Sequence, residues 1–141
     1  MNTSVIAEPT IQAYMETEYR AYGDHPLILK IGQRSNDLTA AYSRCGVATA
    51  AFITACNPFS RELTDAENGA RQAALATELT AGGWRFQEGI GIHPSNEWPG
   101  EPSFLVFGLS RQEAEQISTT WEQNAFVWCS DDALPTLVLL R

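Results

Sequence analysis

Polar side chains that could bind a small molecule gather around one turn and the helix that follows it. Asn57 and Ser60 lie in a turn that ends an apolar strand, and Asn68 and Arg71 lie in the first two turns of the next helix. The amino end of a helix adds unpaired amides and a positive partial charge. Together these residues predict a site for a small polar or anionic ligand.

The spacing along this helix decides which side chains face the site. Positions 68, 72, 75 and 79 share one face, because residues three or four apart stack on a helix. Leu75 and Leu79 mark that face as the one against the sheet, so Asn68 and Gln72 place their amides at its start. The same residues also have a purely structural interpretation. Buried amides more often satisfy adjoining backbone, in which case Asn68 holds the loop and Asn57–Pro58 shapes the turn.

A second candidate segment, residues 89–103, contains Trp98 and Glu101, which are expected at the rim of the same cleft. Trp98 lies between a glutamate and a proline and could line a pocket or a partner surface, and Glu101 precedes an apolar strand. Glu101 could equally be a solvated acid. Gly89 and Gly91 do not predict dinucleotide binding, because the third glycine is missing and no helix follows.

Metal binding and nucleophilic catalysis lack their usual residue patterns. His93 has Glu97 and Glu101 nearby in sequence but without paired helical spacing, so we expect a loop histidine and predict no metal and no cofactor. Cys56 is the one thiol at a strand end, but no basic partner is evident and a buried cysteine is expected. No catalytic residue is assigned, and whether the chain is an enzyme stays open.

Composition restricts the partners. The 141 residues are 44% hydrophobic and 18% charged, which is typical of one globular domain covering 1–141. Seventeen acidic and nine basic residues give a net charge of −8, which disfavours nucleic acid and anionic membranes as partners. The sequence predicts a cytoplasmic protein. The N-terminus is unlike a signal peptide, the three cysteines lack CxxC spacing, and there is no long apolar run.

The elements that must position these residues follow from periodicity and capping signals. Apolar residues at helical spacing predict a helix from Ile11 to Tyr22, ended by Gly23. The polar residues 33–45 predict a loop or a weak helical turn. Capping boxes at Thr64–Glu67 and Ser110–Glu113 begin two further helices, which end near Gly82 and Asn124. Apolar or alternating runs predict strands at residues 25–32, 47–57, 84–92, 104–109, 125–129 and 136–140.

From residue 47 the predicted order is β-α-β-β-α-β followed by one more strand. This order predicts an α+β fold with a ferredoxin-like core, an added N-terminal helix and strand, and a C-terminal strand. Both core helices are expected to cover one face of an antiparallel or mixed sheet.

Several segments of the chain resemble the small bacterial and phage family Domain of Unknown Function 3293, over roughly residues 14 to 140. They are TACNPFSRELTDAENGARQAALATELTAGGWRF, GIG, EPSFLVFGLS and NAFVW. The most specific pieces are Asn57, Pro58 and Ser60 with Asn68 and Arg71, and then Glu101-Pro102-Ser103. The resemblance implies one compact, stand-alone cytoplasmic domain and transfers no activity. A larger residue than Cys56 is expected before the asparagine, so no shared cysteine nucleophile is implied.

Three function classes follow. The first is a small domain that binds a polar or anionic ligand through Asn57, Ser60, Asn68 and Arg71, with Glu101 and Trp98 at the rim. The second is an acidic protein-interaction module, such as an inhibitor or accessory factor in host–phage conflict. The third is a hydrolase or transferase that uses Arg71 and Glu101 in the same cleft.

Overall fold

A seven-stranded antiparallel sheet forms the centre of the molecule, in the order β2-β1-β4-β5-β3-β6-β7. A computed structural model describes residues 4–95 and 100–141. The strands are β1 (Glu18–Ala21), β2 (Leu27–Leu29), β3 (Ala50–Ile53), β4 (Arg85–Ile92), β5 (Glu101–Phe107), β6 (Ala125–Cys129) and β7 (Pro135–Leu139). The helices are α1 (Glu8–Glu16), α2 (Asn36–Cys45), the short 3-10 helix η1 (Pro58–Ser60), α3 (Asp65–Ala81) and α4 (Arg111–Thr120).

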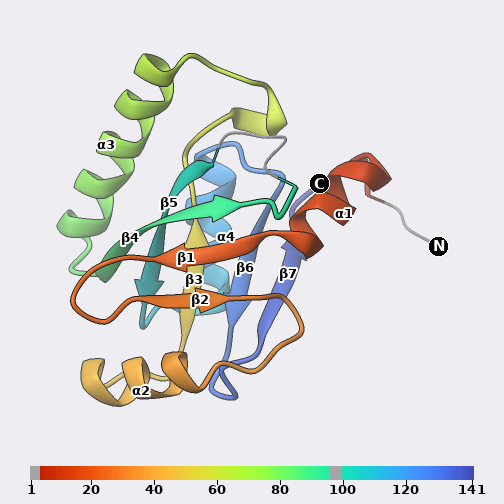
Figure 1. Cartoon of the computed structure of the whole chain (residues 1–141). Coiled ribbons are helices and arrows are strands. Elements are labelled where there is room, and N and C mark those ends of the chain that lie inside the picture. Colours follow the sequence, from red (N-terminus) through yellow and green to blue (C-terminus); the bar gives the residue numbers. More distant parts are fainter. Residues whose placement is uncertain (1–3, 96–99) are drawn as a thin grey trace.

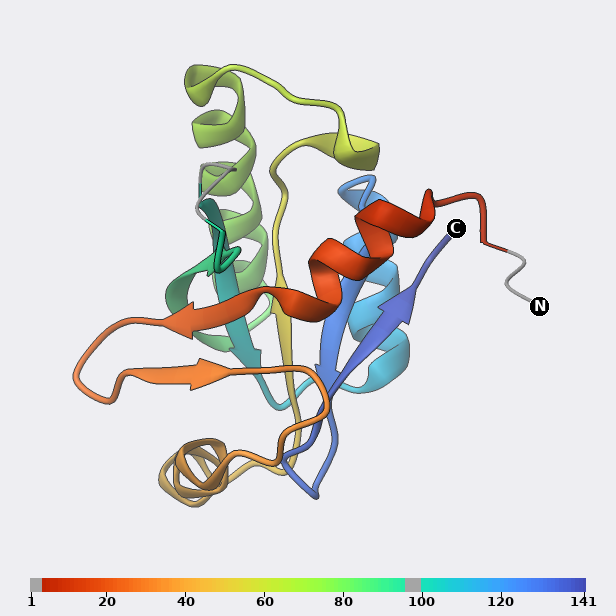
Figure 2. The same cartoon turned by 45° about the vertical axis from the view of Figure 1, so that its right-hand side comes forward.

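The sheet is strongly curled, so that β1 and β2 cross in front of the strands that follow in the sheet order (Figures 1 and 2). Gly89 in β4 permits this curl, because a Cβ there would collide with the Arg20 carbonyl oxygen of β1 and the Phe52 ring of β3. The Tyr19 and Phe52 rings meet edge to face across the fold, with centroids 5.2 Å apart.

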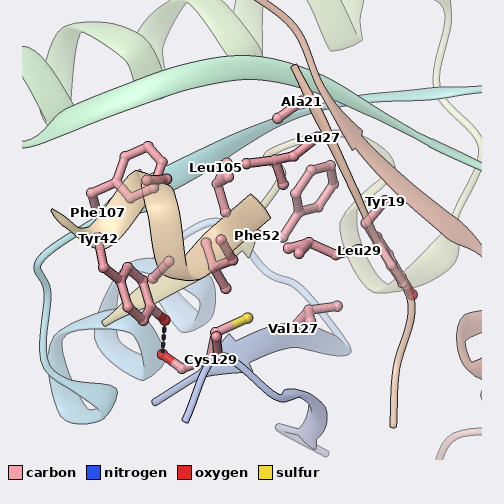
Figure 3. Close-up of a cluster of buried hydrophobic side chains, with 14 residues drawn as sticks. Tyr19, Ala21, Leu27, Leu29, Tyr42, Phe52, Leu105, Phe107, Val127 and Cys129 are labelled. Carbon is pink, nitrogen blue, oxygen red and sulfur yellow. Dashed lines mark hydrogen bonds between the residues drawn. The ribbon is translucent and has the colours of Figure 1, made fainter. Parts of the chain in front are cut away.

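Two apolar clusters lie on the two faces of the sheet. The inner cluster fills the curl and is closed by α2, whose Tyr42 hydroxyl donates to the Cys129 carbonyl oxygen (Figure 3). The outer cluster packs beneath α3, which contributes Leu75 and Leu79, and α4, which contributes Ala114. Both helices therefore cover the same face, and the α+β class is confirmed.

Two predictions about the N-terminal third were wrong. The first helix ends at Glu16, because Thr17 is extended and Tyr19 and Ala21 alternate into the inner core as part of β1. Residues predicted as a loop or a weak helical turn form the ten-residue helix α2, whose Ser35 side chain accepts from the Leu38 amide and whose C-cap Gly46 is left-handed. The added N-terminal part therefore holds two helices and two strands.

The predicted starts of α3 and α4 and the predicted end of α3 were correct, but α4 ends at Thr120 and not near Asn124, since Trp121 is its C-cap and Glu122 is left-handed. Both capping boxes are present, at Thr64–Glu67 and Ser110–Glu113. The fifth strand begins at Glu101 and not at Phe104, since Glu101 and Pro102 pair with Gly91 and Ile90 of β4. No helix in the described ranges is both long and apolar enough to span a bilayer.

Candidate functional site

Two asparagines tie the turn after β3 to the start of α3. The Asn57 backbone N–H donates to Asn68 Oδ1 over 2.9 Å, and Asn68 Nδ2 donates to Asn57 Oδ1 over 2.8 Å. The Leu63 amide adds a third hydrogen bond to Asn57 Oδ1 at 3.0 Å. Asn68 lies on the helix face expected from its spacing, one turn before the buried Gln72. This reciprocal pair holds the loop, as the structural interpretation predicted.

The turn itself contains an unusual backbone. Asn57, Phe59 and Ser60 all have φ values between 50° and 60°, in the left-handed region. Asparagine tolerates this region, whereas Phe59 and Ser60 pay a larger conformational cost, and such strain tends to occur at functional sites. Here the left-handed conformation accompanies a turn in which Asn57 reaches both Asn68 and β5.

Glu101 at the start of β5 is the third member of this cluster. Asn57 Nδ2 donates to Glu101 Oε2 over 2.9 Å. Burial raises the pKa of the half-buried Glu101 carboxyl, and the hydrogen bond from Asn57 opposes this rise. Within residues 4–95 and 100–141, Glu101 forms no ion pair, and its second oxygen, Oε1, accepts no hydrogen bond.

The strand-to-turn segment behind the cluster is held by side chains of α3 and β3. Gln72 Oε1 accepts from the Ala55 amide at 2.8 Å, and Thr54 Oγ1 donates to the Pro102 carbonyl oxygen at 2.7 Å. The Cys56 thiol donates to the same carbonyl at 3.5 Å. Burial raises the pKa of Cys56, so the thiol stays protonated and is a poor nucleophile at neutral pH.

Arg71 is directed to other partners. Its Nε donates to the Ala55 carbonyl at 2.6 Å and its Nη2 to the Trp121 carbonyl at 2.7 Å. Its Nη1 lies 3.4 Å from Glu122 Oε1, and the guanidinium lies 5.5 Å from the Trp121 ring centroid. These contacts connect α3 to the end of α4, and none of them involves Asn57, Asn68 or Glu101.

Ser60 is exposed and lies in a separate polar group. Asn124 Nδ2 donates to Ser60 Oγ over 2.7 Å, and the Tyr14 hydroxyl of α1 shares a 2.8 Å hydrogen bond with the same atom. Buried Gln123 donates to the Cys56 carbonyl at 3.0 Å. The sequence analysis missed these three partners, because residues that follow α4, or belong to α1, show by themselves no sign of which turn they contact.

The amino end of α3 is already supplied with negative charge. The Glu67 carboxylate accepts from the Thr64 amide at 3.1 Å, which holds the pKa of Glu67 below its ordinary value. Asp65 also lies in the first turn. The protein's own carboxylates therefore meet the positive end of this helix. Trp98, predicted at the rim, lies outside the described residues.

His93, expected to be a loop histidine, is bonded on both ring nitrogens. The Ser95 backbone amide donates to Nδ1, so the neutral ring carries its proton on Nε2, which lies 3.1 Å from Glu16 Oε1. His93, Glu16 and Lys30 line an open hollow of about 350 Å³ between α1, the loop after β2 and the end of β4. No group of three potential metal ligands occurs in the part of the chain that the structure describes.

Comparison with known proteins adds a family. A family model described as "Protein of unknown function (DUF3293)" matches residues 53–126, more than half of the chain. The matched segment runs from the end of β3 into β6, and so contains Asn57, Asn68 and Glu101 together with the elements that hold them. No curated protein and no solved structure matches the chain.

Proposed function

The chain belongs to the DUF3293 family, whose description assigns no activity, and on that premise we propose that it is a small ligand-binding domain. Its site is the cluster of Asn57, Asn68 and Glu101 between the turn after β3, the start of α3 and the start of β5. All three side chains are half-buried, so they are held by the fold and still reachable from solvent.

One observation carries this proposal. The asparagine pair uses its carbonyl oxygens on protein donors, whereas Glu101 Oε1 accepts no hydrogen bond from residues 4–95 or 100–141. Among the described residues, the buried side-chain polar atom without a partner is Ser118 Oγ, so Glu101 Oε1 is open to solvent and can accept a hydrogen bond from water or from a ligand. The hydrogen bond from Asn57 to Oε2, with Asn57 itself held by Asn68, fixes the orientation of the carboxylate and so the direction of Oε1.

The ligand is a small molecule with hydrogen-bond donors. Of the two ligand classes that the sequence suggested, the polar one is better supported than the anionic one. Glu67 and Asp65 occupy the positive end of α3, and the Arg71 guanidinium is engaged by two carbonyl oxygens and Glu122. An anion beside Glu101 would meet a like charge.

The architecture and location belong to the same proposal. The order β4-β5-β3-β6, with α3 and α4 on one face, supports a ferredoxin-like unit within a single domain of residues 1–141. Free Cys45, Cys56 and Cys129 support a reducing, cytoplasmic location.

A thermal-shift screen tests the binding function. Neutral, anionic and cationic polar compounds, including nucleotides, phosphates and carboxylates, are tested with the full chain. A ligand at one hundred times its Kd stabilises the folded state by about 2.7 kcal/mol. At least one compound is expected to raise the Tm of the wild type and of the control Glu88→Gln by a few degrees, and to leave Glu101→Gln unchanged.

Glu88 is a suitable control because it is an exposed carboxylate of β4 outside the cluster. If no compound stabilises the wild type, or if Glu101→Gln responds like the wild type, the proposed site is wrong. A stoichiometric, salt-sensitive protein partner captured from lysate in that case would favour the acidic interaction module.

A further inference from the structure

The negative charge of the ionised Glu101 carboxylate is not balanced by a positively charged side chain in any described ion pair. Within residues 4–95 and 100–141, none of the ion pairs includes Glu101. The whole chain carries eight more acidic than basic residues.

Arg71, a cationic side chain that influences the same thiol as Glu101, has its partners elsewhere. Arg71 and Glu101 both influence Cys56, since the negative charge of Glu101 raises the pKa of that thiol and the positive charge of Arg71 lowers it. Arg71 nevertheless directs its three nitrogens to Ala55, Trp121 and Glu122. The only donor to the Glu101 carboxylate in the described structure is therefore the neutral amide of Asn57.

We propose that the group bound at Glu101 is a small organic cation with N–H donors, an ammonium or amidinium-type group, which supplies the charge that the fold leaves out. This inference rests on the proposed ligand-binding function and names the ligand's chemical class. Charge-assisted hydrogen bonds of this kind are shorter and stronger than neutral ones, and a planar N–H pair matches a carboxylate well.

Asn57 positions the carboxylate for this partner. Its Nδ2 holds Oε2, while its own carbonyl oxygen is held by Asn68 and the Leu63 amide, so the side chain is anchored on both ends. The other titratable groups coupled to Glu101 are the Cys56 thiol and the Tyr19 phenol. Burial raises the pKa of both, so both are neutral at neutral pH and neither competes for the cation.

Acetamidinium, acetamide and acetate test the inference, because the three have nearly the same shape and charges of +1, 0 and −1. Each is titrated into the ¹⁵N-labelled full chain, and the side-chain amide resonances of Asn57 and Asn68 are followed. We expect saturable shifts with acetamidinium, at an affinity at least tenfold above that of acetamide, and no saturable shift with acetate.

Two variants and a pH series complete the test. Glu101→Gln should reduce acetamidinium affinity at least tenfold, and Glu88→Gln, which also removes one surface charge, should leave it within a factor of two. In the wild type, acetamidinium affinity should rise with pH as Glu101 ionises. This measurement needs no variant, so it still tests the inference if Glu101→Gln does not fold.

The outcomes separate the two proposals. If acetamide or acetate binds the Asn57–Asn68 amides as tightly as acetamidinium, the cation inference is overturned and the binding site stands. The same holds if acetamidinium gives no saturable shift but the wider thermal screen finds another Glu101-dependent compound. If both experiments are negative, both proposals are wrong.

Discussion

Arg71 and Glu101 approach the same segment, residues 54–57, from α3 and β5, yet their surroundings differ sharply. The Arg71 guanidinium has two carbonyl oxygens, a carboxylate and an aromatic ring around it. Glu101 has one neutral amide. A charge that is fully paired within the protein contributes to the fold, whereas a half-buried charge without a counter-charge is available for a ligand. The sequence analysis placed both residues in one site, and the structure separates their roles.

The largest expected effect comes from breaking the paired side of this comparison. Arg71→Ala leaves the Ala55 carbonyl without its donor, leaves the Trp121 carbonyl only Gln123 Nε2 as a donor, and removes the contact with the Trp121 ring. We expect the free energy of unfolding to fall by about 2–3 kcal/mol, measured by urea denaturation.

The matched control for Arg71 is Arg111→Ala, which removes an exposed ion pair with Glu115 in α4. Such pairs contribute little, so a loss below about 0.5 kcal/mol is expected. Equal losses in the two variants would show that Arg71 does not connect α3 and α4 as described.

A smaller effect is expected where the two regions share the turn. Asn68→Ala removes the acceptor of the Asn57 amide and one donor to Asn57 Oδ1. We expect a loss of about 1–2 kcal/mol in the same denaturation experiment, together with weaker acetamidinium binding, because Asn57 then no longer holds Glu101 in place. Unchanged binding in a destabilised variant would mean that Asn57 does not position the carboxylate.

The smallest effect is expected at Glu101 itself, and it depends on pH. Because burial raises the pKa of Glu101 in the folded protein, the native state binds more protons than the unfolded state in the interval between the two pKa values. The contribution of Glu101 to stability is therefore complete below its unfolded pKa and is lost as the pH rises through its folded pKa.

Glu101→Gln removes this titration and keeps an acceptor for Asn57. Relative to the wild type, the variant should gain stability as the pH is raised from about 4 to 8, because only the wild type must ionise a carboxyl whose pKa burial has raised. Urea denaturation at a series of pH values measures this difference. A pH-independent difference, or one of opposite sign, would mean that Glu101 ionises without penalty in the folded state.

Local signals in the sequence were sufficient for the central helices. The capping box at Thr64–Glu67 and the spacing of Asn68, Gln72, Leu75 and Leu79 predicted both the start of α3 and its buried face, because these are contacts between residues three or four apart. The same type of signal was present for α2, at Ser35 and Gly46, but the polar composition of the segment led to its prediction as a loop or a weak helical turn.

Long-range contacts were beyond such reasoning. The pairing of Tyr19 and Ala21 with two neighbouring strands overrode the helical spacing that continued to Tyr22. Two partners of Arg71, Trp121 and Glu122, lie 50 and 51 residues away along the chain. Glu16 and His93 meet across a still longer separation. Nothing in either segment alone indicates which distant group it contacts.

By itself, the sequence determined the α+β class, the starts of α3 and α4, the end of α3, the acidic charge and the polar residue types near the turn at Asn57, because these depend on composition and on interactions over a few residues. The tertiary structure decided the curl of the sheet and the different roles of Arg71 and Glu101. The energy of a charged side chain depends on the dipoles, charges and solvent that surround it, and here those come from elements far apart in the chain.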